Sequence, residues 1–173
     1  FPYGLIGFFT LMTSLFVLLD LGLTPTIVRE SARFVNGNFC SQEYLKFVRS
    51  FECIFFVVGA LIALIVLCSS KYIALYWLDP KILPIEDIKI CIVLMGFILF
   101  CRWVSGFYRG VISGYEKIVW LSSVNAIFAT LKFVLVIPVI YINNSPITFF
   151  SYQLIIALTE LFSISFYGRR LLP

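Results

Sequence analysis

Residues Cys53–Ser70 read CIFFVVGALIALIVLCSS and contain no charged side chain. About 20 largely apolar residues are enough for a helix to cross the hydrocarbon core of a bilayer. The longer segment around this stretch, from about Phe47 to Ser70, is therefore predicted to be a transmembrane helix.

The composition of the whole chain supports the same conclusion. Of 173 residues, 61% are hydrophobic, 18% are aromatic and 13% are charged, and the mean hydropathy is +1.03. A soluble domain carries about a quarter charged residues, so this chain has too little charge to coat a water-exposed surface. A soluble fold would also expose many aromatic rings as aggregating patches. The sequence indicates an integral membrane protein.

Four more segments are long and apolar enough to cross a membrane. They run from about Tyr3 to Thr26, from Ile88 to Ser113, from Ile118 to Ile142 and from Ile147 to Gly168. An outer-membrane barrel would instead show segments of about 10 residues that alternate apolar and polar. We therefore expect an all-α membrane protein whose 173 residues form a single bundle of about five transmembrane helices. Because the chain begins with Phe1 inside an apolar stretch, we expect it to be a piece of a larger protein.

The basic residues in the predicted loops and at the ends of the predicted spans predict the orientation. Eight are assigned to the side of the first loop and of the C-terminal end, and three to the opposite side. The eight are Arg29, Arg33, Lys46, Arg49, Arg109, Lys117, Arg169 and Arg170, and the three are Lys71, Lys81 and Lys89. Cytoplasmic loops carry an excess of Lys and Arg. The first loop and the C-terminal end are therefore predicted to be cytoplasmic.

Ionisable side chains inside the predicted spans are the candidate functional residues, because each costs about 2.5–3.5 kcal/mol at the bilayer centre on insertion scales. Several of them head a polar stripe at helical spacing. The stripes are Asp20 with Thr10, Thr13 and Thr24; Arg102 with Ser105, Gly106, Arg109 and Ser113; Lys132 with Ser122 and Asn125; and Glu160 with Gln153 and Ser163. We interpret them as the lining of a hydrated, partly cationic cavity. The alternative is structural: the charges pair, as Asp20 with Arg102 or Lys132 with Glu160, or extend to an interface.

Small and kinking residues predict where helices approach one another and where they bend. Gly106, Gly110 and Gly114 recur every four residues, so one helix face would let another backbone come close. The alternative is that the last two glycines merely end the span. Pro25 and Pro138 are predicted kink points.

Several kinds of chemistry are excluded by the residues themselves. There is no His, so His-based triads and His metal sites are absent. The five cysteines form no C-x-x-C pair, and no phosphate-binding loop of the G-x-x-x-x-G-K-[ST] type occurs. We expect no metal and no cofactor, and we attribute the net charge of +4 to basic loops rather than to a nucleic-acid partner.

Two stretches resemble a known transporter family. The segments Tyr3–Phe9, Leu19–Thr26 and Arg29–Arg33 are similar to the second helix and following loop of Wzx-type O-antigen and polysaccharide flippases. The segment Tyr108–Gly114 is similar to the loop between that family's fourth and fifth helices. On this resemblance Arg29, Glu30, Arg33 and Arg109 belong to cytoplasmic loop motifs.

The resemblance implies a multi-pass transporter of the MATE-like superfamily, with twelve to fourteen helices in two bundles, in the bacterial inner membrane. This chain would supply helices two to six of the N-terminal bundle. The substrate would be an undecaprenyl-pyrophosphate-linked oligosaccharide for O-antigen or capsular polysaccharide, flipped to the periplasmic leaflet by alternating access. Other proteins of polysaccharide assembly, such as a polymerase or a chain-length regulator, are the implied partners besides membrane lipid.

Specific residues can be assigned to that activity as expectations. Lys132 and Arg102 would bind the pyrophosphate, and Asn125 and Gln153 would contact sugar hydroxyls. Asp20 or Glu160 would take up a proton and bias the two access states. We expect a transporter and not an enzyme.

Three other functions remain open from the sequence. A MATE-type drug exporter would share the architecture but would favour acidic cavity groups for its cationic substrates, whereas Lys132 and Arg102 are basic. A membrane glycan polymerase or transferase would need a larger catalytic segment than the longest predicted loop, about Lys71–Asp87. A structural membrane subunit is the third alternative.

Overall fold

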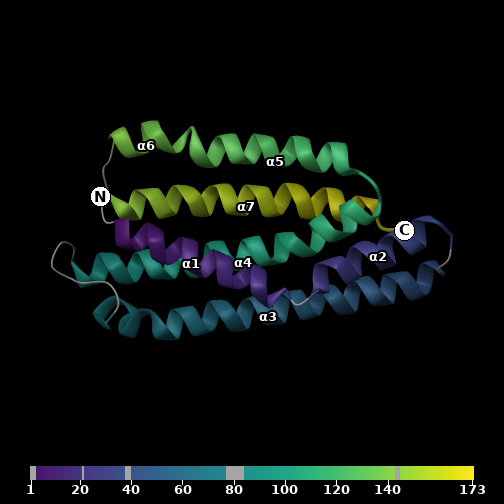
Figure 1. The fold of residues 1–173 in the computed structure, drawn as a ribbon, viewed down its shortest axis with the longest axis horizontal. Coiled ribbons are helices and arrows are strands. Elements are labelled where there is room, and N and C mark those ends of the chain that lie inside the picture. Colours follow the sequence, from purple (N-terminus) through teal and green to yellow (C-terminus); the bar gives the residue numbers. More distant parts are fainter. Residues whose placement is uncertain (1–2, 21, 38–39, 77–83, 143–144) are drawn as a thin grey trace.

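Every regular element that the structure describes is an α-helix. The computed structural model describes residues 3–20, 22–37, 40–76, 84–142 and 145–173. Lys81, one of the residues counted for the orientation, lies outside these ranges. The helices (Figure 1) are α1 (Tyr3–Leu19), α2 (Leu23–Val35), α3 (Ser41–Tyr76), α4 (Ile85–Gly114), α5 (Ile118–Phe133), α6 (Val136–Ile142) and α7 (Pro146–Leu171). The all-α membrane bundle expected from the sequence is confirmed.

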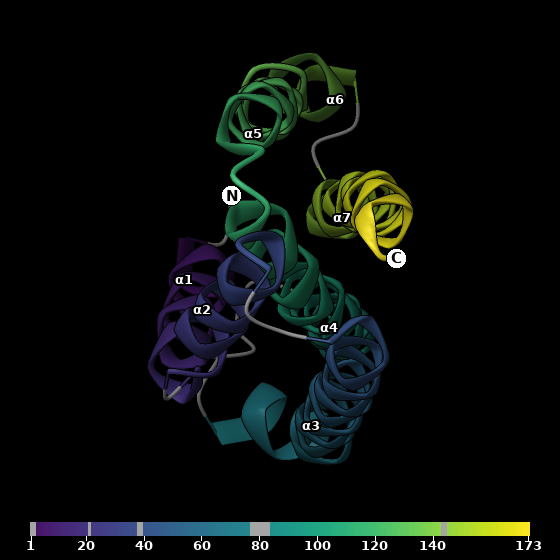
Figure 2. The ribbon, with the colours of Figure 1, turned by 90° about the vertical axis from the view of Figure 1, so that its right-hand side faces the viewer.

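Helix α4 is the centre of the assembly. It contacts α1, α2, α3, α5 and α7, and Figure 2 shows it between α3 and α7, with α1 and α2 along one side. Its buried residues include Met95, which packs in a group with Phe150 of α7, and Phe107, which packs in a group with Ile27 of α2. Over half of the apolar window of α4, 56%, is buried inside the bundle, against 17% for α3 and 11% for the α5–α6 segment. The outer helices therefore turn most of their apolar surface outward.

The surface of the bundle has the polarity expected in lipid. Large apolar side chains lie outside, among them Ile65 at 61% exposure, Phe133 at 73% and Phe162 at 70%. The carboxylate-bearing residue Glu160, in contrast, is only 4% exposed. Apolar residues outside and a charge inside reverse the pattern of a soluble protein, and hydrocarbon accepts such a surface.

Among the described residues, four helical segments are long and apolar enough to cross a membrane. These are Ser41–Ile73, Ile85–Gly114, Ile118–Tyr141 and Pro146–Leu171. The first expected span differs, because its apolar helix, Gly4–Leu15, is shorter.

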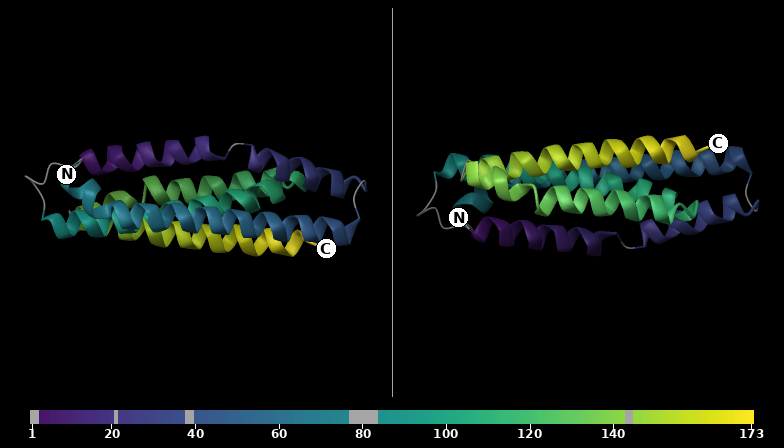
Figure 3. Two further views of the ribbon diagram at one scale, coloured as in Figure 1. Left: turned by 90° about the horizontal axis from the view of Figure 1, so that it is seen from below. Right: turned by 90° about the horizontal axis from the view of Figure 1, so that it is seen from above.

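The break in the first expected span, about Tyr3 to Thr26, falls between α1 and α2. Gly22 has a φ of 86°, a left-handed conformation that glycine adopts without a steric penalty. The Asp20 carboxylate then accepts bonds from the backbone N–H and the hydroxyl of Thr24, at 3.1 and 2.9 Å. Pro25 lies in the first turn of α2, where its missing N–H is tolerated. After the break, α2 continues in nearly the same direction as α1 (Figure 3).

A second break divides the expected fourth span into α5 and α6. Pro138 has no N–H to donate to the carbonyl of Val134, four residues earlier. That carbonyl accepts instead from the N–H of Ile137, at 3.2 Å. The interruption therefore lies at residues 134–135, one turn before the predicted kink residue.

The segment expected to be a loop after the first span, about Arg29–Glu43, is largely helical. Helix α2 extends to Val35 because its residues are amphipathic: Ile27, Glu30 and Ser31 are buried at helical spacing, whereas Arg29 is exposed. The loop assignment was therefore wrong for the residues of α2.

The close approach predicted from the glycines of α4 is present at two of the three positions. A Cβ placed on Gly114 would lie 2.4 Å from the Cβ of Ser31 and 2.7 Å from the carbonyl oxygen of Val28. A Cβ on Gly110 would also touch α2, whereas one on Gly106 would meet nothing within 4 Å. Helix α2 therefore rests against the C-terminal half of α4, where side chains would hold it away.

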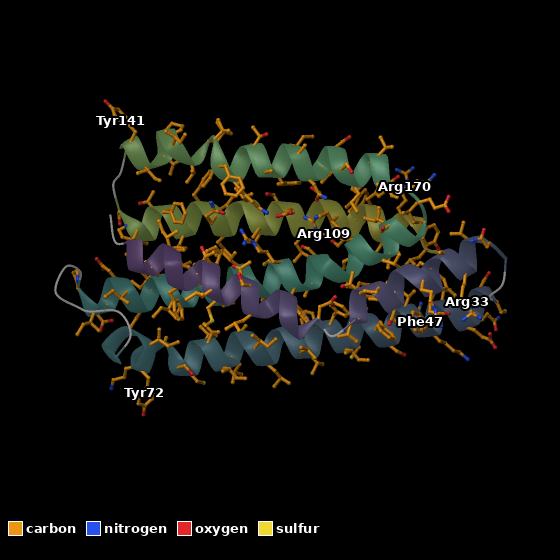
Figure 4. All side chains as sticks on the ribbon, viewed as in Figure 1. Arg33, Phe47, Tyr72, Arg109, Tyr141 and Arg170 are labelled. Carbon is orange, nitrogen blue, oxygen red and sulfur yellow. The ribbon has the colours of Figure 1, made fainter. Side chains whose placement is uncertain are left out.

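The two ends of the bundle differ in composition. Figure 4 shows Arg33 and Arg170 at one end, Tyr72 and Tyr141 at the other, and Arg109 between them. Tyr72 is 68% exposed and Tyr141 is 92% exposed. Exposed tyrosines are typical of a membrane interface, and basic residues are typical of the cytoplasmic side.

Candidate functional site

A basic cavity lies between α4, α5 and α7. Helix α4 contributes Arg102, Ser105 and Arg109, which are three and four residues apart and so share one face. The cavity has a volume of about 410 Å³. Its other lining residues are Asn125, Ala129, Lys132 and Phe133 from α5, and Glu160 from α7.

Glu160 lies at the centre of the charges in this cavity. Its side chain is 5% exposed. One carboxylate oxygen accepts from the Arg109 guanidinium, and the other accepts from the Lys132 ammonium group. A carboxylate buried in this way must be compensated by close partners, because desolvation of a lone charge is costly. The pairing of Lys132 with Glu160, one of the two structural alternatives weighed from the sequence, is present.

The cavity nevertheless holds more positive than negative charge. The described charged residues that line it are Arg102, Arg109, Lys132 and Glu160, which leave a surplus of two positive charges. Arg109 also donates to the side-chain carbonyl of Asn125, so this guanidinium joins three helices. A site that binds an anion away from water requires such a surplus of positive charge, because a buried charge must be compensated.

Arg102 is the basic residue of the cavity that forms no ion pair in the described part of the chain, although it lies within the electrostatic range of Glu160. Its Nε atom is buried and has no hydrogen-bond partner there. Its guanidinium carbon lies 5.2 Å from the centre of the Phe9 ring, within the range of a cation–π contact. A buried N–H donor without an acceptor is costly, so a hydrogen-bond acceptor placed at this Nε would be stabilising.

Two smaller cavities adjoin the first one through Arg102. One, of about 310 Å³, is shared with Lys132 and is lined further by Thr10, Thr13 and Gln153. The other, of about 230 Å³, is lined by Thr13, Asp20, Thr24, Phe55, Leu99, Trp103 and Gly106. Each of the four predicted stripes therefore contributes residues to at least one of the three cavities, and Arg102 lines all three. Ser113, Ser122 and Ser163, which were assigned to the stripes, line none of these cavities.

The candidate residues for sugar contact differ in their surroundings. Asn125 faces the main cavity beside Arg109. Gln153 is buried and donates from its amide to the backbone carbonyl of Lys132, at 3.2 Å. The neighbouring Tyr152 donates to the carbonyl of Leu131, at 2.7 Å. Both bonds meet α5 just before its break, where α7 supplies donors to the interrupted backbone.

Asp20 lies at the start of the break between α1 and α2, and it does not line the main cavity. It lines the smallest cavity together with Arg102, but no ion pair joins the two in the residues that the structure describes. Its carboxylate is bound by Thr24, as a helix cap. The Asp20–Arg102 pair weighed from the sequence is therefore absent.

The four residues assigned to cytoplasmic loop motifs divide into two groups. Glu30 is bonded by Arg33, at 2.8 Å, and by Arg29, at 3.3 Å, on the helix α2. Arg109 is not a loop residue, because α4 continues past it to Gly114 and its side chain enters the cavity. The loop assignment of Arg109 is corrected accordingly.

A second polar cluster was missed by the reasoning from sequence. The hydroxyl of Tyr108 donates to Glu52, and Arg169 donates to both, at 2.9 Å to the hydroxyl and 2.6 Å to the carboxylate. The cluster joins α4, α3 and α7. The available signal was Glu52 itself, an acidic residue inside the predicted span Phe47–Ser70 that was assigned to no polar stripe.

No metal site emerges from the described residues, in which His, Cys, Asp and Glu side chains form no group of three or more. Comparisons with protein-family models, with curated proteins and with solved structures found no match to this chain.

Proposed function

We propose that this chain forms part of a transporter that flips an undecaprenyl-pyrophosphate-linked oligosaccharide across the bacterial inner membrane by alternating access. The observation that carries the proposal is the surplus of positive charge in the cavity between α4, α5 and α7. The sequence resemblance to Wzx-type flippases supplies the identity of the substrate, and the expected partners in polysaccharide assembly follow from it.

The electrostatics of the cavity suit a diphosphate. A pyrophosphate esterified at both ends carries two negative charges, and the cavity holds Arg102, Arg109 and Lys132 against Glu160. Guanidinium and ammonium donors form strong, charge-assisted bonds to phosphate oxygens. In surroundings of low polarity such bonds are stronger than in water. The excess of bases weighs against a drug exporter for cationic substrates.

The structure around the cavity supports movement between two access states. The helix breaks at Gly22 and before Pro138 lie in elements that border the three cavities. Such interruptions are places where a membrane helix bends with little rearrangement of its packed parts. Alternating access by bending at these points is part of the proposal.

The first test is export of the glycan in cells that depend on this protein. Lys132→Ala is expected to impair O-antigen or capsule export without loss of protein from the membrane, because it removes one of the cations available to the diphosphate. The matched control is Lys117→Ala, which removes an exposed lysine from the α4–α5 connection and is expected to export normally. Full activity of Lys132→Ala would contradict the proposed role.

A second test uses the full-length protein in vesicles. The proposal requires transfer of a defined lipid-linked glycan from one leaflet to the other, and a loss of transfer in Lys132→Ala. If the vesicles export a cationic dye and leave the lipid-linked glycan in place, the drug-exporter alternative replaces the flippase.

A further inference from the structure

The two carboxylate oxygens of Glu160 bind cations from two different helices. Arg109 of α4 donates to Oε1, and Lys132 of α5 donates to Oε2. A phosphate group held by the same two residues would occupy this position, with two of its oxygens in place of the carboxylate oxygens. Glu160 thus fills the place of an anion in the cavity.

We propose that Glu160 is an internal substitute for the anionic ligand, which takes up one proton and releases Arg109 and Lys132 when a phosphate ester binds. The proposal rests on the proposed function for the identity of the ligand, a diphosphate diester. It adds that binding of this anion and binding of a proton are coupled at one residue. The proton comes from the acid form of the buffer, which is left as its conjugate base, and it joins a carboxylate oxygen of Glu160.

The reason for proton uptake is the charge around Glu160. The charged groups that face it are Arg102 and Arg109 from α4 and Lys132 from α5. From α6, which also packs on α7, the titratable side chain is Tyr141, and it is 92% exposed. An arriving anion neutralises the bases that stabilise the carboxylate. A buried carboxyl group next to an anion favours its neutral form, both by desolvation and by repulsion.

Arg102 gives the anion a first contact that does not require displacement of Glu160. Its buried Nε has no acceptor among the described residues, and it borders the main cavity and both adjoining ones. An anion that reaches Arg102 from either smaller cavity is already next to Lys132 or the main cavity. Protonation of Glu160 then makes the remaining two bases available.

The experiment measures anion binding and proton uptake together, with the full-length protein in lipid nanodiscs. The probe is a short-chain prenyl diphospho-sugar, whose own charge is constant between about pH 5.5 and 8.5 because both phosphates are esterified. Calorimetry in buffers of different ionisation enthalpy reports the protons taken up per anion. We expect close to one proton at pH 7.5, and binding about tenfold tighter for each unit by which the pH falls in that region.

Variants separate this role from a structural one. Glu160→Gln has the shape of the protonated residue, so it should bind the probe at least tenfold tighter at pH 7.5, a gain of about 1.4 kcal/mol or more, without proton uptake. The matched control is Glu52→Gln, which removes a carboxylate paired with Arg169 outside the cavity. This control should keep the proton uptake and the pH dependence of the unaltered protein.

The outcomes distinguish the two proposals. Two results overturn the role of Glu160 and leave the flippase proposal standing. One is that the unaltered protein binds the probe without proton uptake. The other is that folded Glu160→Gln binds the probe no more tightly than the unaltered protein. Failure of the unaltered protein and of both variants to bind the probe at any pH overturns both. If Glu160→Gln does not fold, the proton uptake of the unaltered protein decides.

Discussion

A single methyl group added in turn to the three spaced glycines of α4 tests how α2 is held in the bundle. At Gly114 the new Cβ would lie 2.4 Å from the Cβ of Ser31 and 2.7 Å from a backbone carbonyl oxygen of α2. At Gly110 the nearest atom would be a methyl carbon of Ile27, at 3.3 Å. At Gly106 no atom lies within 4 Å. The same substitution therefore meets a severe clash, a tight contact and open space.

The magnitudes follow from two opposing terms. Replacing glycine by alanine inside a helix stabilises it by about 0.5–1 kcal/mol. Overpacking costs about 1–3 kcal/mol, and the upper end applies at Gly114, because the atoms in the way belong to the backbone and to a Cβ, which cannot rotate aside. We expect Gly106→Ala to gain up to about 1 kcal/mol, Gly110→Ala to be close to neutral, and Gly114→Ala to lose about 2 kcal/mol.

The assay is unfolding of the purified protein in mixed micelles with increasing SDS, followed by far-UV circular dichroism. Gly106→Ala serves as the matched control, since it changes the same residue type on the same helix. The order of midpoints should be Gly114→Ala, then Gly110→Ala, then Gly106→Ala, from lowest to highest. Equal midpoints for Gly114→Ala and Gly106→Ala would refute the close packing of α2 on α4.

Substitutions at Asp20 and at Tyr108 test two further contacts. Asp20→Ala should destabilise the protein by about 1 kcal/mol, because α2 loses its cap. Asp20→Asn should keep both stability and export, since an amide oxygen still accepts from Thr24. An Asp20→Asn variant of normal stability that has lost export would instead show that Asp20 carries a proton. Tyr108→Phe should lower the free energy of unfolding in the SDS titration by about 1.5 kcal/mol, because the Tyr108 hydroxyl bonds to charged Glu52 and Arg169. An unchanged midpoint would mean that this cluster contributes nothing to stability.

Much of the fold was predictable because lipid imposes simple rules on sequence. The charge-free stretch Cys53–Ser70 lies within α3, Gly110 and Gly114 mark the close approach of α2, and Pro138 follows a break in its helix. The interruption at Gly22 was not predicted, because a glycine is compatible with helical and with left-handed backbone, and the sequence does not say which of the two it adopts. The helix α2 was predicted to be a loop because its arginines suggested a solvated segment, although Ile27 and Ser31 form a buried face.

The sequence predicts which polar residues share a helix face, but it does not predict which residues of different helices form ion pairs. Helical periodicity placed Asn125 and Lys132 on one face of α5, and both line the main cavity. The partner of Glu160 depends on how α7 is rotated against α4 and α5, which no local pattern specifies. For the same reason Arg109, counted among loop residues, proved to be a direct partner of that carboxylate.

The position of Arg102 has a consequence for the size of molecule that the bundle can admit. Its side chain lines all three of the cavities described above. A molecule bound in any one of them therefore borders the same guanidinium group. A molecule too long for one cavity extends into the next past Arg102, so the same positive charge borders both of the cavities that it occupies.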